Sequence, residues 1–133
     1  MRHALDPGQF TPVGIFLTEY CRTTCLSVSN IDYYIEDFTD RKQLKIMLVE
    51  EKQNGGMMGD SQRLCYRNLH RHLMVSAPML QTDYWGVFVL QLARGTTLPG
   101  PGMTLNGKPI TLEEFVRHIN FEVKFCDGIF RQG

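Results

Sequence analysis

The sequence predicts an α/β fold in which a central mixed β-sheet is flanked by helices. Two strand-like segments lie side by side in the first half of the chain, over residues 31–38 and 44–52. An amphipathic helical pattern precedes them, and a second one separates them from a long apolar segment at residues 84–92. Strands that alternate with helical patterns are typical of α/β proteins.

Length and composition indicate one folded domain. The 133 residues suffice for a core, and 43% hydrophobic and 21% charged residues are ordinary proportions for a globular protein. We expect a core over about residues 11–92 and a C-terminal extension over 93–133. The formal net charge is zero, so a nucleic-acid partner would require a local basic surface.

The cysteines and the apolar runs bear on location. The four cysteines are spread along the chain without a CxxC pair, which favours reduced thiols and a cytoplasmic protein over a disulfide framework. Residues 1–9 have no apolar signal-peptide segment, and no apolar run is long enough to span a membrane. We therefore expect no membrane partner.

The first predicted helix covers Val13–Cys25. Thr11 is a suitable N-cap and Pro12 suits the first helical position. Glu19 and Arg22 fall on the same face of this helix. Glu19 is either a surface carboxylate or a group that reaches the site described next.

Two strands, Ile31–Phe38 and Leu44–Lys52, should form a hairpin around a polar turn. If the turn centres on Arg41, paired position numbers sum to about 82 and Asp32 lies opposite Glu50. Two carboxylates on directly opposite residues of a hairpin lie close enough to repel each other unless a cation lies between them.

Glu50, Glu51 and Lys52 end the second strand of this hairpin. Side chains two apart share a face, so Glu50 and Lys52 point one way and Glu51 points the other. The simplest explanation is a solvated strand end. The alternative is a site that combines a metal ion with a base, because charges at the end of a buried strand are costly.

A Gly-rich loop over residues 53–59 follows and lacks the P-loop pattern. It is either a plain connector, which is the simpler explanation, or a loop that contacts the substrate. Asp60 or Ser61 then caps a helix that we expect to end near Met74, because Ser76-Ala77-Pro78 ends this region. One helical stripe carries apolar residues together with two polar groups that could face the site: Gln62, Tyr66, Leu69 and Leu73. A neighbouring stripe is basic and could contact a phosphate backbone: Arg63, Arg67, His70 and Arg71.

The rest of the chain predicts four further elements. Tyr84–Leu92 should be a core strand, and Asn106-Gly107 indicates a hairpin between short strands. Thr111 opens a capping box and a helix to about Asn120. The alternating segment Phe121–Phe125 predicts a last short strand.

Asp32 and Glu50 are hard oxygen ligands that suit Mg²⁺ or Mn²⁺, ions that keep several waters and bind substrate phosphates. Lys52 could orient or deprotonate an attacking water, or stabilise the charge on phosphate. Gln62 and Tyr66 could hydrogen-bond the substrate or a neighbouring side chain. These parts suit hydrolysis of a phosphodiester.

Taken together, the motifs resemble those of the PD-(D/E)XK, or restriction-endonuclease-like, nuclease superfamily. Asp32 followed by Glu50-x-Lys52 is similar to its signature, and Gln62-Arg63-Leu64-Cys65-Tyr66 to the QxxxY motif of its RecB-like branch. Thr18-Glu19-Tyr20-Cys21-Arg22 resembles an N-terminal acidic motif of such nucleases. Ile31 replaces the proline of the pattern. The resemblance covers about residues 11–92 and points to small stand-alone phage or archaeal nucleases and Holliday-junction resolvases.

The resemblance implies an αβββαβ core, here followed by a C-terminal hairpin and helix. It also implies a Mg²⁺- or Mn²⁺-dependent deoxyribonuclease of a bacterial, archaeal or phage-infected cell. Asp32, Glu50 and the Glu51 backbone carbonyl would hold the metal. The catalytic set would be Asp32, Glu50, Lys52, Glu19, Gln62 and Tyr66, and the DNA-binding set Arg63, Arg67, Arg71 and Arg22. An iron–sulfur cluster is not expected, because only Cys126 follows the last core strand.

Three alternatives stay open. One is a Holliday-junction resolvase that acts as a homodimer on branched DNA. Another is an inactive nucleic-acid-binding protein that kept the fold. The third is an interaction module in which the acidic residues are surface charges, which would place Asp32 and Glu50 too far apart to share one ion. The pattern leaves open endonuclease against exonuclease activity, strand preference and oligomeric state.

Overall fold

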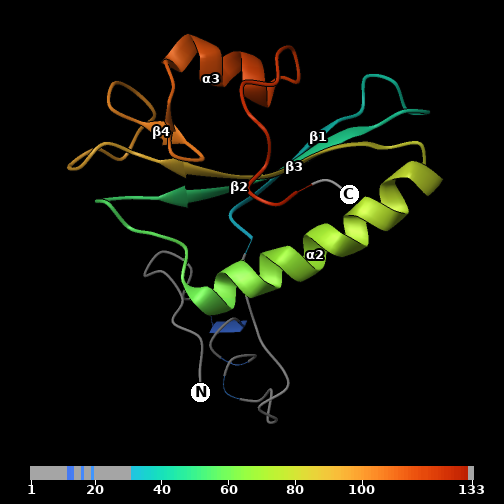
Figure 1. Ribbon diagram of the computed structural model, residues 1–133, viewed down its shortest axis with the longest axis horizontal. Coiled ribbons are helices and arrows are strands. Elements are labelled where there is room, and N and C mark those ends of the chain that lie inside the picture. Colours follow the sequence, from blue (N-terminus) through green and yellow to red (C-terminus); the bar gives the residue numbers. More distant parts are fainter. Residues whose placement is uncertain (1–11, 14–15, 17–18, 20–30, 132–133) are drawn as a thin grey trace. The chain divides into compact units, whose positions relative to one another are not determined.

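The computed structural model describes residues 12–13, 16, 19 and 31–131 (Figure 1). The chain divides into two units, residues 1–30 and 31–133, and each is considered by itself. In the first unit Pro12, Val13, Phe16 and Glu19 are helical, as predicted for them. Arg22 lies outside the described residues. Within the described part of the chain, no helix has the length and apolar character needed to cross a membrane.

A five-stranded mixed sheet forms the centre of the second unit, with the order β1-β2-β3-β4-β5. Strands β2 and β3 are parallel, and every other neighbouring pair is antiparallel. The strands are β1 (Tyr33–Asp37), β2 (Lys45–Lys52), β3 (Asp83–Gln91), β4 (Thr104–Leu105) and β5 (Lys108–Pro109). The α/β class is confirmed. The αβββαβ order is wrong for the described residues, because two strands rather than three precede the second helix.

The β1–β2 hairpin has the register expected for a turn centred on Arg41. Tyr33 pairs with Val49, and Asp37 pairs with Lys45. One further step along the ladder brings Asp32 beside Glu50. The polar turn is tied by hydrogen bonds of its own, including one from the Lys42 backbone amide to Asp40 Oδ1 at 3.0 Å.

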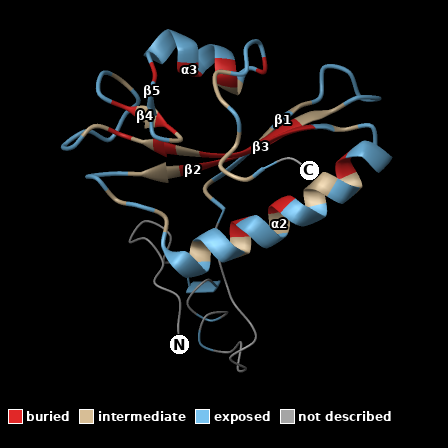
Figure 2. Ribbon diagram, in the orientation of Figure 1, coloured by how far each residue is buried: buried red, intermediate tan, exposed pale blue. Residues whose placement is uncertain are grey.

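Helix α2 (Asp60–Met79) connects the parallel strands β2 and β3 and covers one face of the sheet (Figure 1). Its inner side buries Tyr66, His70 and Ala77. Figure 2 shows buried positions of α2 in red. The predicted cap at Asp60 or Ser61 is wrong, because Gly59 is the N-cap and no side chain caps the helix. The predicted end near Met74 is also wrong, since the helix continues through Pro78. Proline lacks the N–H that would donate to the carbonyl four residues earlier, so this last turn loses one intrahelical hydrogen bond. Ala77 also packs with Ile46 and Tyr84.

Helix α3 (Leu112–Ile119) covers the opposite face of the sheet (Figure 1). The predicted capping box is present: Thr111 Oγ1 accepts from the Glu114 amide at 3.1 Å, and the Glu114 side chain accepts from the Thr111 amide at 2.9 Å. The predicted Asn-Gly hairpin is also confirmed, with positive φ at both Asn106 and Gly107. The larger core lies on this side: Met47, Val49, Trp85, Phe88, Leu90, Leu92, Met103, Leu105, Ile110, Phe115 and Phe121.

The strand predicted over Phe121–Phe125 is wrong. The chain turns sharply after α3, with Phe121 at a φ of 58°, and continues as irregular backbone. Phe121 packs edge-on against Trp85 from this irregular segment, whereas Val123 is exposed. The Phe125 amide donates to His118 Nδ1 at 3.1 Å rather than to a neighbouring strand.

His118 makes folding sensitive to acid. Burial, and then the nearby positive charge of Lys124, lower the pKa of this fully buried imidazole from 6.5 to about 4. The unfolded chain therefore binds a proton between these pH values and the folded chain does not. We expect the free energy of unfolding to fall by about 3 kcal/mol as the pH falls through this window.

Urea unfolding at a series of pH values measures this dependence. His118→Leu should show a flatter decline between pH 6.5 and the range where carboxylates titrate. The matched control is His72→Leu, since His72 is exposed on α2 and should leave the wild-type slope intact. Equal slopes in wild type and His118→Leu would contradict the assignment.

Candidate active site

The candidate site lies where β2 ends and α2 begins. Ile46, Leu48, Glu50 and Lys52 alternate on the face of β2 that α2 covers, as the pleat of a strand requires. Glu50 follows four buried apolar residues near the end of the strand, and it is itself 0% exposed although its side chain is ionisable. This burial contradicts the surface-charge explanation for Glu50.

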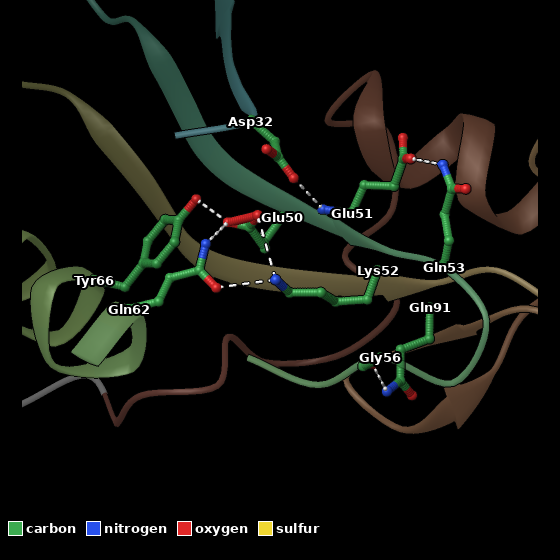
Figure 3. A network of polar contacts seen from close by, with 9 residues as sticks. All are labelled: Asp32, Glu50, Glu51, Lys52, Gln53, Gly56, Gln62, Tyr66 and Gln91. Atoms are coloured by element: carbon green, nitrogen blue, oxygen red, sulfur yellow. Dashed lines mark hydrogen bonds and ion pairs between the residues drawn. The ribbon is translucent and has the colours of Figure 1, made fainter. Parts of the chain in front are cut away.

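Glu50 is held by side chains from the first turns of α2 (Figure 3). Its Oε2 accepts from Tyr66 Oη at 2.6 Å and from Gln62 Nε2 at 3.0 Å. The other end of the same amide, Gln62 Oε1, accepts from Lys52 Nζ at 3.0 Å. Gln62 and Tyr66 are four residues apart, so one face of α2 presents both to the strand.

Glu50 Oε1 is buried and has no hydrogen-bond partner among the described residues. Lys52 Nζ lies 4.0 Å from it, and the Lys52 side chain is only 10% exposed. A buried carboxylate oxygen without a donor is costly and uncommon. A group that supplies positive charge beside Oε1 would remove that cost.

Asp32 lies directly before β1 and faces the end of β2. Its Oδ2 accepts from the Glu51 backbone amide at 2.8 Å, which fixes the carboxylate at this point (Figure 3). Asp32 and Glu50 therefore lie close together, as predicted. The hairpin register brings them together, since they are far apart in the sequence.

The surroundings oppose a charge on Glu50. Burial raises its pKa from 4.5 to about 8, and the neighbouring Asp32 carboxylate acts in the same direction. The Tyr66 hydroxyl and the Lys52 ammonium oppose that rise. Burial and the Glu50 carboxylate also raise the pKa of Tyr66, so its hydroxyl keeps its proton and acts as a donor.

Glu51 points to the other face of the sheet, as predicted. Its carboxylate accepts from Gln53 Nε2 at 2.6 Å and from Tyr33 Oη at 3.3 Å, and its charge raises the pKa of Tyr33. In a strand, the N–H and C=O of one residue point to the same side. The Glu51 carbonyl therefore points to the side where its amide meets Asp32.

These groups fit a small divalent cation. Asp32 and Glu50 supply carboxylates, the Glu51 carbonyl points to the same edge, and Glu50 Oε1 is buried without a donor. Among the described side chains, no three His, Cys, Asp or Glu residues cluster around a common point. Two carboxylates and a carbonyl leave coordination positions for water and substrate oxygens, which is how Mg²⁺ is commonly bound.

Other predicted residues lie elsewhere. Arg63, Arg67 and Arg71 are exposed along α2, and the Arg63 guanidinium lies 5.5 Å from the ring centre of Phe130. His70 does not belong to this basic face. It is buried, with Nδ1 2.8 Å from Tyr84 Oη and Nε2 3.0 Å from the Arg131 carbonyl oxygen. Glu19 belongs to residues 1–30, which are described separately.

Gln91 is a site neighbour that the sequence did not single out. It pairs with Lys52 across the parallel ladder and donates from Nε2 to the Gly56 carbonyl at 3.0 Å (Figure 3). The Gly-rich loop is thus tied to the sheet. The sequence pattern could have identified Gln91, because it is a polar residue near the end of an apolar strand, as Glu50 is in β2.

No family model, curated protein or solved structure matches this chain significantly. The resemblance to PD-(D/E)XK nucleases therefore stays a prediction that rests on residues and their arrangement. The arrangement itself consists of a carboxylate pair, an adjacent ammonium, and an amide that bridges Glu50 and Lys52.

Proposed function

We propose that this protein is a divalent-metal-dependent DNA nuclease that hydrolyses phosphodiester bonds with water as the nucleophile. One observation carries the proposal: the Glu50 carboxylate is fully buried, and one of its oxygens accepts no hydrogen bond from the part of the chain that the structure describes. Asp32 and Lys52 lie beside it. A purely structural carboxylate in this position would destabilise the fold, so its presence favours a role in binding a cation.

In this proposal Asp32, Glu50 and the Glu51 carbonyl hold Mg²⁺ or Mn²⁺. When bound, the ion supplies positive charge to the phosphate and makes a water acidic enough to attack near neutral pH. Tyr66 and Gln62 fix Glu50 from the α2 side, which keeps its free oxygen directed away from the helix.

Lys52 acts on the phosphate. Gln62 Oε1 accepts a hydrogen bond from Nζ and so orients the ammonium, which would then meet a phosphate oxygen or the attacking water. A fixed ammonium stabilises the negative charge that develops in the transition state. The basic face of α2, with Arg63, Arg67 and Arg71, would bind the DNA backbone and supply the local positive charge that a neutral protein needs.

Incubation with DNA in the presence of Mg²⁺, Mn²⁺ or EDTA tests the proposal. Linear, circular, single-stranded and branched substrates separate endonuclease from exonuclease and junction-resolving activity. We expect cleavage with either metal and none in EDTA, with recovery when excess Mg²⁺ is added back. Cleavage that persists in EDTA would contradict the mechanism. If none of the DNA substrates is cleaved in the presence of metal, the proposed function is wrong.

A further inference from the structure

Two loops meet beside Lys52, at the carboxyl ends of the parallel strands β2 and β3. They cover residues 53–59 and 92–102. The Leu92 amide donates to the Lys52 carbonyl at 2.9 Å, and the Gly95 amide donates to Asn54 Oδ1 at 3.0 Å. Together with the bond from Gln91 to Gly56, these contacts hold the loops against each other. Ligands commonly bind at this end of parallel strands.

Arg94 lies against Gly55 within this pair of loops. A methyl group built on Gly55 would lie 2.6 Å from Arg94 Nη2 and 3.0 Å from Cζ, and Gly55 has a φ of +75°. The absence of a side chain thus lets the guanidinium pack directly on the loop backbone. Arg94 is exposed, and it is the sole charged residue in either loop. No carboxylate of the described residues forms an ion pair with it.

We propose that Arg94 binds a backbone phosphate of DNA next to the phosphate that is cleaved; this rests on the proposed nuclease function. Lys52 and Gln91 are paired across strands about 4.8 Å apart. Arg94 follows Gln91 by three residues, which puts its loop next to the site. A guanidinium already held against a glycine loses little freedom on binding, and its planar fork matches two phosphate oxygens. A structural arginine would instead be expected to pair with a carboxylate.

Steady-state cleavage of a fluorescein-labelled DNA oligonucleotide tests this assignment, with binding of the same DNA measured in EDTA over a range of salt concentrations. Arg94→Gln should raise KM about tenfold and change kcat less than about twofold. The slope of log affinity against log salt should become shallower by about 0.7 to 0.9. Arg94→Lys should recover part of the affinity. The matched control is Arg117→Gln, which removes an exposed arginine on α3 and should leave KM and the slope unchanged.

Gly55→Ala provides a second variant, because it displaces the guanidinium without removing its charge. It should raise KM, and combining it with Arg94→Gln should raise KM no further.

If wild type cleaves DNA and Arg94→Gln keeps the wild-type KM and salt slope, the phosphate-binding role proposed for Arg94 is wrong and the proposed function stands. A lower thermal midpoint for Arg94→Gln with an unchanged KM would show a structural role and also overturn the inference. If wild-type protein neither binds nor cleaves DNA, both proposals fail.

Discussion

Glu50→Gln should abolish metal-dependent cleavage and, at the same time, stabilise the protein above neutral pH. The glutamine oxygen can accept from Tyr66 and Gln62 as Glu50 Oε2 does. Its NH₂ group would replace the buried oxygen that has no donor and would face the acceptor Asp32. Only the charge, and with it a ligand for the cation, is lost. We expect kcat/KM to fall by about a thousandfold or more, typical for loss of a group that stabilises transition-state charge.

The stability effect follows from the raised pKa of Glu50. The folded chain keeps the proton up to about pH 8, whereas the unfolded chain releases it near pH 4.5. The tighter binding of this proton in the folded chain contributes a few kcal/mol to the free energy of unfolding. The contribution is fully present below pH 4.5 and is lost as the pH rises through about 8. Glutamine does not titrate, so Glu50→Gln should unfold at a higher temperature than wild type near pH 8.

Thermal unfolding from acid to alkaline pH, with and without Mg²⁺, measures both consequences. Mg²⁺ should raise the midpoint of wild type and leave that of Glu50→Gln unchanged. Glu122→Gln is the matched control, since Glu122 is exposed after α3 and should change neither activity nor stability. A Glu50→Gln protein that cleaves DNA at the wild-type rate would refute the assigned role.

Lys52→Ala should lower kcat by about a hundredfold or more, with a much smaller change in KM. Its ammonium is oriented by Gln62 and lies 4.0 Å from Glu50 Oε1. Loss of the ammonium also removes a positive charge that lowers the pKa of Glu50. The pH profile of any residual activity should therefore shift to higher pH, a change that loss of packing alone would not cause.

Steady-state kinetics over a range of pH values separates these effects. Lys45→Ala is the matched control, because Lys45 lies at the opposite end of β2 and pairs with Asp37. Lys52→Arg keeps the charge but replaces a compact ammonium by a planar group, so it should recover little activity. Wild-type kcat in Lys52→Ala would exclude a role for this residue in the reaction.

The hairpin was the most predictable part of the site. Its register depends on local turn chemistry and on alternation of buried residues, and both can be read from the sequence. The contacts of Gln62 and Tyr66 with Glu50 follow from the same alternation combined with helical spacing. By contrast, the contact of Asp32 with the Glu51 amide and the position of Arg94 depend on how loops close in three dimensions.

Two of the wrong predictions, the end of α2 and the strand at Phe121–Phe125, have identifiable causes. Pro78 indicated a helix end, but burial of Ala77 against the sheet stabilises the last turn that contains it. The alternating Phe121–Phe125 segment indicated a strand, but alternation of apolar residues does not establish backbone pairing, and Val123 within it is 53% exposed. Here a loop around the end of α3 buries Phe121, and His118 takes the hydrogen bond that a neighbouring strand would have accepted.

The residues that complete the α2 layer come from far along the chain. Ile129 and Phe130 pack with Leu48 and Val87, and the Arg131 carbonyl meets His70 across a sequence separation of 61 residues. Contacts between such distant residues form slowly, since a long loop must close before they contribute. During synthesis the hairpin and α2 can associate early, but the inner face of α2 stays partly uncovered until residue 131 has been added. The order of translation therefore means that the support beneath Tyr66, and with it the setting of Glu50, is complete only after residue 131 has been made.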